Sequence, residues 1–135
     1  MRTCVKPLLE HRSITLDALL RGWVIKYLER IVTLPLNGAR LVVMGLVPPI
    51  AEGEVYYGGA ILPVAGSNAE RVEYTLAMNQ ILAEECAARE LPFLEMYDNH
   101  HDERGLISPE YSDGNVHVIK TQHVRAGLQR LGVIP

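Results

Sequence analysis

Apolar residues near the start of the chain repeat at the spacing of a helix. Between residues 16 and 31 they recur every three or four positions, which is typical of an amphipathic helix with one broad apolar face. Ser13 or Thr15 stands where such a helix needs its N-terminal cap. Residues 1–13 lack this periodicity and include a proline, so we expect them to be irregular.

Two further helices are expected in the second half of the chain. Ser67 and Glu70 have the spacing of a capping box, and they open a helix that runs to about residue 89. This spacing gives Ser67 a structural role, because a nucleophilic serine of an α/β enzyme normally follows a strand in a strained turn. The last helix is expected after His117 and ends near residue 131.

Two short segments have the pattern of strands. Residues 40–47 are almost continuously apolar and rich in β-branched side chains, as in a strand that is buried on both faces, and residues 91–97 form a second such segment. A strand, a helical crossover and a strand form a βαβ unit, so the two strands should pair in parallel with a right-handed crossover. The alternation of elements predicts an α/β fold in three layers, with a parallel sheet between helices on both faces.

Composition and charge restrict the class of protein. The 135 residues fit one domain, residues 1–135, with 48% apolar and 21% charged side chains. The net charge of −3 is mixed along the chain, which argues against a nucleic-acid groove and a basic membrane anchor. No apolar run approaches the roughly 20 residues of a membrane-spanning helix. The start of the chain lacks the apolar core of a signal peptide, and Cys4 and Cys86 are far apart, so a reducing, cytoplasmic location is expected.

The segment after the first predicted strand is a candidate ligand-binding surface. Pro48 and Pro49 end that strand, and ligands of open α/β sheets bind at the carboxyl ends of the strands. Residues 50–66 then form a long, glycine-rich loop that contains Tyr56 and Tyr57. Loops of this length in small domains are usually functional or disordered. We therefore expect Pro48, Tyr56 and Tyr57 to line a substrate site.

The strongest candidate for chemistry is the segment Ser112-Asp113-Gly114-Asn115-Val116-His117. Histidine is the usual general base, and an aspartate bonded to one ring nitrogen leaves the other nitrogen free to accept a proton. Gly114 and Asn115 can form the turn between the two residues, and Asn115 is a candidate substrate contact. A simpler alternative is that Asp113 or Asn115 caps the last helix and that His117 has no catalytic role.

Three pieces of the chain resemble the C-terminal part of the SGNH hydrolase superfamily, the GDSL-like esterases and lipases. They are residues 27–31 with 39–49, the helix with Asn79 followed by the strand at 92–97, and residues 112–117. The last piece is similar to the block in which that family keeps its catalytic aspartate and histidine. The resemblance covers about residues 14–131. It implies a flavodoxin-like fold and hydrolysis of an ester or acyl group through an acyl-serine, with His117 as general base and Asp113 as its orienting partner.

The chain departs from that family in two respects. The family spacing is Asp-x-x-His, whereas one more residue separates Asp113 from His117, and no Gly-Asp-Ser block is present. The resemblance therefore implies a partial domain, incomplete at the N-terminal side and without the nucleophile. A parallel sheet that lacks a strand exposes edges and apolar faces. We therefore expect self-association or a complementing N-terminal piece, a small-molecule ester as substrate, and no cofactor.

Two other functions remain open at this point. The first is a non-catalytic α/β module that binds a small ligand or a protein through residues 50–66. The second is a metal site made from His100 or His101 together with Asp98, Asp102 or His117. Adjacent residues of an extended chain point in opposite directions, so the two histidines seldom share one ion. We therefore expect a solvated loop here and no metal.

Overall fold

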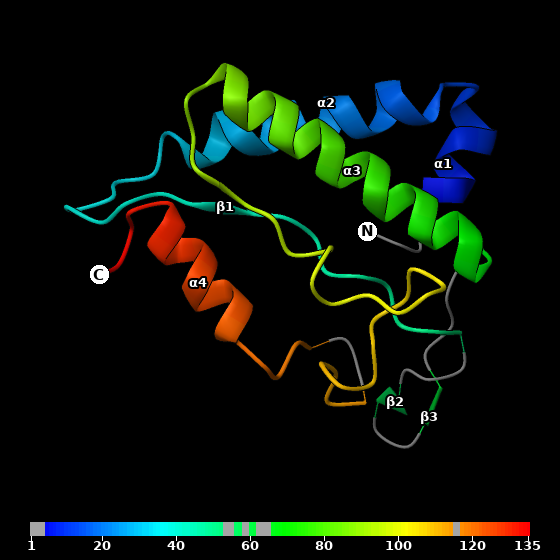
Figure 1. Cartoon of the computed structure of the whole chain (residues 1–135). Helices are drawn as coiled ribbons and strands as arrows, with labels where there is room; N and C mark the ends of the chain where they lie inside the picture. Colours follow the sequence, from blue (N-terminus) through cyan, green and yellow to red (C-terminus); the bar gives the residue numbers. More distant parts are fainter. Residues whose placement is uncertain (1–4, 53–55, 58–59, 62–65, 115–116) are drawn as a thin grey trace.

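A computed structural model of the chain describes residues 5–52, 56–57, 60–61, 66–114 and 117–135. The helices are α1 (Val5–Arg12), α2 (Leu16–Ile31), α3 (Asn68–Ala88) and α4 (Gln122–Arg130). The strands are β1 (Val43–Met44), β2 (Tyr56–Tyr57), β3 (Ala60–Ile61) and β4 (Phe93–Leu94). Figure 1 shows α2 and α3 side by side, with α4 on the other side of β1.

The predicted helices α2 and α3 are confirmed together with their caps. The Thr15 hydroxyl accepts a hydrogen bond from the backbone N–H of Ala18 at 3.2 Å. Ser67 and Glu70 exchange both hydrogen bonds of a capping box, so Ser67 has the structural role that its spacing predicts. The two helices pack on each other through the main core, in which each fully buried large side chain contributes roughly 1.5–3 kcal/mol. Its buried members are Val5, Leu19, Leu20, Val24, Leu28, Val43, Met78, Ile81, Leu82 and Cys86.

The strands β1 and β4 pair in parallel, as the βαβ pattern predicts, with Val43 opposite Phe93 and Met44 opposite Leu94. The wider prediction of a three-layer, flavodoxin-like sheet is wrong. In the described part of the chain the parallel sheet has two strands, and the rest of the regular structure is mainly helical. The apolar run at 40–47 is not buried on both faces, because Met44 is 49% exposed. The continuous apolar run therefore predicted a longer strand and a wider sheet than the structure has.

A side chain of α3, rather than another strand, holds the segment that follows β1. The amide oxygen of Asn79 accepts from the Leu46 N–H at 2.6 Å, and its amide nitrogen donates to the Leu46 carbonyl at 2.9 Å. A Cβ at Gly45 would lie 3.2 Å from that amide oxygen and 3.1 Å from the Phe93 ring. Glycine at this position lets α3 approach the strand closely enough for the amide to reach the backbone.

Two of the predicted boundaries at the ends of the chain are wrong. Residues 5–12 form α1 rather than irregular structure, because Pro7 lies in the first helical turn, where its missing N–H breaks no helical hydrogen bond. The last helix begins at Gln122, five residues after His117 rather than directly after it. It packs closely on β4 through Gly127, where a Cβ would overlap the Leu94 side chain.

Candidate functional site

The two segments that leave the parallel strands meet beyond their carboxyl ends. Ile107, which follows β4, donates its N–H to the carbonyl of Pro49, which follows β1, at 2.9 Å. Ile50 and Ile107 are buried together, and Val118 from the C-terminal part packs against them. This small second core therefore anchors the segment around Val118 at the edge of the sheet where α/β proteins bind ligands.

Residues 111–114 and 117–119 run antiparallel, and this arrangement, the acid–base turn, presents the predicted pair. The Ile119 N–H donates to the Tyr111 carbonyl at 2.9 Å, and the Asp113 N–H donates to the His117 carbonyl at 3.3 Å. Ser112 and Val118 form an antiparallel bridge between them. Gly114 has φ +83°, a conformation that glycine adopts without strain. The turn therefore places positions 113 and 117 opposite each other, at the same end of the antiparallel pair.

The predicted contact between Asp113 and His117 is present in this turn. The Asp113 Oδ2 lies 2.7 Å from the His117 Nδ1. A carboxylate only accepts, so the Nδ1 donates in this bond, and Nε2 is the ring nitrogen left to exchange a proton. The His117 side chain is 72% exposed and that of Asp113 is 31% exposed. The pair is therefore oriented as an acid–base pair and is open to solvent.

The alternative role of Asp113 as a helix cap is wrong. The N-cap residue of α4 is Thr121, which lies eight positions beyond Asp113 and makes no side-chain cap bond. The same assignment excludes Asn115 as the cap of this helix. His117 is therefore the partner to which the turn directs the Asp113 carboxylate.

The predicted substrate contacts fall into two groups. Pro48 is fully buried beside Pro49, so its side chain is not exposed to a ligand in this structure. Asn115 and most of the 50–66 loop lie outside the described residues. The backbone of Tyr56 and Tyr57 forms β2, which pairs with β3, but their side chains are not among the described ones. The role of Asn115 and both tyrosines in binding stays a prediction, as does the binding module based on that loop.

Two buried polar side chains support this end of the molecule; the sequence did not single out Arg71, and it did not predict the burial of His100. Arg71 of α3 is 1% exposed and donates from Nη1 to the Ile50 carbonyl at 2.7 Å and from Nη2 to the Asn68 side chain. Burial lowers the pKa of the Arg71 guanidinium, and the Glu52 carboxylate opposes this shift. Arg71 lies four residues before Thr75 on the buried face of α3, and this helical spacing was the signal in the sequence that could have indicated its burial.

His100 is the second such residue: the loop around it is solvated as expected, with Asp98, Asn99, His101 and Glu103 exposed, but His100 itself is buried. Its side chain is 1% exposed, and Nδ1 donates to the Met96 carbonyl at 2.9 Å. The rings of Tyr111 and His123 meet it edge-on at centroid distances of 5.2 and 5.5 Å. The adjacent His101 is exposed. His100 therefore ties the loop after β4 to the base of the acid–base turn.

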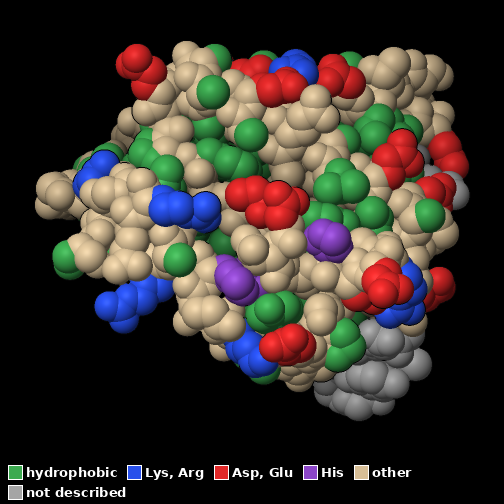
Figure 2. Space-filling model, viewed as in Figure 1, with side chains coloured by type: hydrophobic (Ala, Val, Ile, Leu, Met, Phe, Trp, Pro, Cys, Tyr) green, Lys and Arg blue, Asp and Glu red, His purple; other side chains and the backbone are tan. Residues whose placement is uncertain are grey.

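No metal centre is present in the described ranges of the chain, where no group of three or more His, Cys, Asp and Glu side chains could hold an ion. None of the described helices is both long enough and apolar enough to cross a membrane. Acidic and basic side chains are interspersed over the face of the molecule shown in Figure 2. No protein-family model, curated protein or solved structure matches the chain significantly.

Proposed function

We propose that this chain carries the acid–base pair of an ester or acyl hydrolase of the SGNH, GDSL-like type. The observation that supports it is the 2.7 Å contact from Asp113 Oδ2 to His117 Nδ1 in a turn beyond the carboxyl ends of the strands. The pair has the arrangement in which an aspartate fixes the tautomer and orientation of a catalytic imidazole. His117 is the general base, and Asp113 is its positioning residue.

The chemistry follows from the free Nε2 of His117. It takes the proton of a hydroxyl group as the oxygen of that group bonds to the acyl carbon of the ester. The resulting imidazolium returns the proton to the leaving alkoxide as the old carbon–oxygen bond breaks. Water repeats the two steps on the acyl intermediate and releases the acid. Asp113 stabilises the imidazolium and stays ionised throughout.

The nucleophilic hydroxyl comes from another polypeptide segment in this proposal. Two of the four serines have structural hydrogen bonds: Ser67 caps α3, and the Ser112 hydroxyl accepts from the Gly114 N–H at 3.0 Å. The sequence contains no Gly-Asp-Ser block. The chain alone should therefore act only on activated esters, with water or the imidazole itself as the attacking group.

Hydrolysis of p-nitrophenyl acetate by the purified chain tests this role of His117. His117→Ala should lose most of the rate above buffer, and added imidazole should restore part of it. Asp113→Asn should lower the rate about tenfold or more, because the imidazole loses its fixed tautomer. His11→Ala is the matched control, since His11 is also exposed but lies on α1, and it should keep the rate. Equal rates for the natural chain and a folded His117→Ala variant would exclude the proposal.

A further inference from the structure

Three aromatic side chains meet at the base of the acid–base turn. His100 comes from the loop after β4, Tyr111 begins the turn, and His123 lies in the first turn of α4. Their ring centroids are 5.2, 5.5 and 5.7 Å apart, and each pair meets edge-on. Figure 1 shows the loop after β4 beside the segment that leads into α4. This group, the histidine cluster, therefore holds the chain on both sides of the turn.

The imidazole of His100 has one buried nitrogen that no described group bonds. The residue is 1% exposed, and its Nδ1 donates to the Met96 carbonyl at 2.9 Å. Its Nε2 is buried and has no hydrogen-bond partner in the described part of the chain. A neutral ring places only a lone pair at this nitrogen. A protonated ring would place an N–H and a positive charge there, and buried charges need a partner.

The charged side chains around the histidine cluster pair with other groups or face solvent. Glu110 accepts from Lys120 at 2.7 Å, and that ammonium lies 5.5 Å from the centre of the Tyr111 ring. Other titratable groups of the same segments are bound to neighbours or exposed: Glu95, Asp98, His101, Asp102, Arg104 and Arg125. His123 faces His100 directly, and imidazoles gain their charge between about pH 5 and 8. Acid therefore adds positive charge to a buried cluster in which no described carboxylate contacts His100.

We propose that His100 is a pH-sensitive switch for the acid–base turn: its neutral ring holds Tyr111 and His123 in place, and its protonation releases them. The neutral ring is the form that fits this site, so the closed turn is favoured at high pH and is lost as the pH falls. Its regulatory consequence rests on the proposed function, because release would stop hydrolysis by withdrawing the support of the acid–base pair. The release itself is measured without a substrate.

Nuclear magnetic resonance of the natural chain, between about pH 8 and 5, tests the proposal. The imidazole ¹⁵N signals show where His100 takes up its proton, and hydrogen exchange gives the protection factor of the Ile119 N–H, which bonds the Tyr111 carbonyl at 2.9 Å. That protection should fall about tenfold or more as His100 titrates, because the turn opens locally. Protonated His117 would bind the Asp113 carboxylate more strongly, so His117 opposes this fall and cannot cause it.

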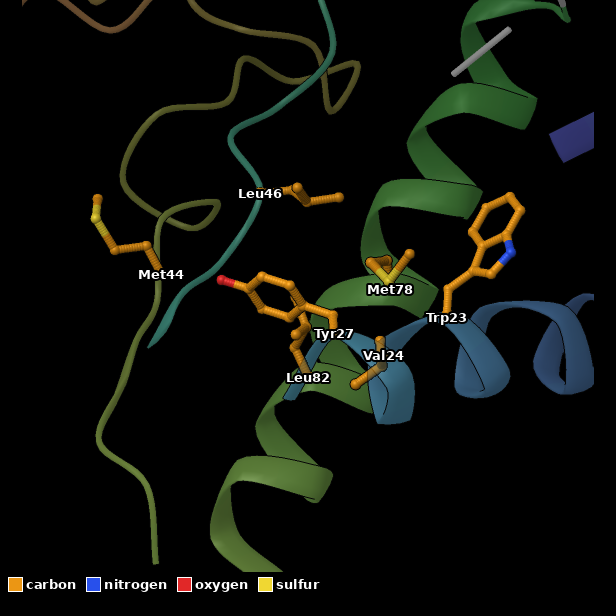
Figure 3. Close-up of a pocket in the computed structure, with 7 residues that line it drawn as sticks. All are labelled: Trp23, Val24, Tyr27, Met44, Leu46, Met78 and Leu82. Atoms are coloured by element: carbon orange, nitrogen blue, oxygen red, sulfur yellow. The ribbon is translucent and has the colours of Figure 1, made fainter. Parts of the chain in front are cut away.

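The main core provides the control for general unfolding. The single tryptophan of the chain, Trp23, lines a pocket of about 300 Å³ between α2, α3 and β1. Figure 3 shows only apolar and aromatic side chains around this pocket, so its packing should not respond to histidine protonation. The fluorescence of Trp23 should therefore stay constant while the Ile119 protection falls. A simultaneous change in both signals would mean that acid unfolds the whole chain, and it would overturn the proposal.

Replacement of His100 by asparagine separates this histidine from the others. The amide keeps an N–H donor for the Met96 carbonyl but takes up no proton, so in His100→Asn the Ile119 protection should no longer depend on pH. His101→Gln is the matched control, since His101 is adjacent but exposed, and it should keep the natural pH dependence.

Two outcomes would overturn this switch. One is a His100 ring that titrates in the natural chain while the Ile119 N–H stays protected, a result that needs no variant to fold. The other is a His100→Asn chain with the natural pH dependence. A release that follows His100 in a chain whose ester hydrolysis does not depend on His117 would support the switch and refute only the proposed function.

Discussion

Replacement of Asn79 by alanine tests whether one amide side chain holds the end of β1. In the structure this amide is 8% exposed and makes both hydrogen bonds to the Leu46 backbone. Alanine leaves an N–H and a carbonyl without these partners, and each buried group left unsatisfied costs about 1–3 kcal/mol. Leu46 is only half-buried, so water reaches part of it and the low end applies. The expected loss is about 2 kcal/mol, a large share of the roughly 5–15 kcal/mol that stabilises a domain.

Urea unfolding followed by circular dichroism measures this loss, at a protein concentration low enough to keep the chain monomeric. Gln80→Ala is the matched control: it removes a similar amide one residue further on, where the group is exposed and bonds Glu84, and it should cost less than about 0.5 kcal/mol. Asn79→Asp tests the direction of a pH effect. An ionised carboxylate at position 79 would be repelled by the Leu46 carbonyl, whereas a protonated carboxyl group could donate a hydrogen bond to it. That variant should gain stability relative to Asn79→Ala as the pH falls. An Asn79→Ala chain as stable as the control would refute the reasoning.

Three further substitutions test the packing of α4, the helix propensity of α2 and the ion pair between α2 and α3. Gly127→Ala should lower stability in thermal melts by about 1–2 kcal/mol, because its Cβ would overlap the buried Leu94 side chain. Gly22→Ala should raise stability by up to about 1 kcal/mol, because a Cβ there meets nothing within 4 Å. Hydrogen bonds from Arg89 and then Arg21 hold the pKa of Glu85 below its usual value. A carboxyl group whose pKa is lowered in the folded state stabilises the fold at neutral pH, and this stability is lost as the pH falls through that pKa. Arg21→Gln should therefore reduce the fall in melting temperature between neutral and acidic pH, which thermal melts measure.

The sequence predicted those parts of the fold that local pattern controls. The caps of α2 and α3 and the parallel pairing of β1 with β4 depend on spacing and element order, and all are confirmed. The width of the sheet depends on how many segments pair, and a single apolar run does not contain that information. At the end of β1, Asn79 takes the place that a neighbouring strand would have taken.

The candidate site shows the same division between local and long-range information. Asp113 and His117 are four residues apart, so a turn alone brings them together, and the sequence was sufficient to find the pair. Arg71 and His100 are buried by segments distant in the chain; a solvated loop was expected at His100, and nothing was predicted for Arg71. Burial of a polar residue is a property of tertiary packing, so it cannot be deduced from composition around that residue.

Exposure determines what each proposed substitution reports. The His117 side chain is 72% exposed, so its replacement removes a reacting group and leaves the main core intact. Asn79 and Gly127 are buried, so their replacement changes folding first and any activity only through folding. A loss of ester hydrolysis in His117→Ala, together with unchanged unfolding, therefore points to chemistry.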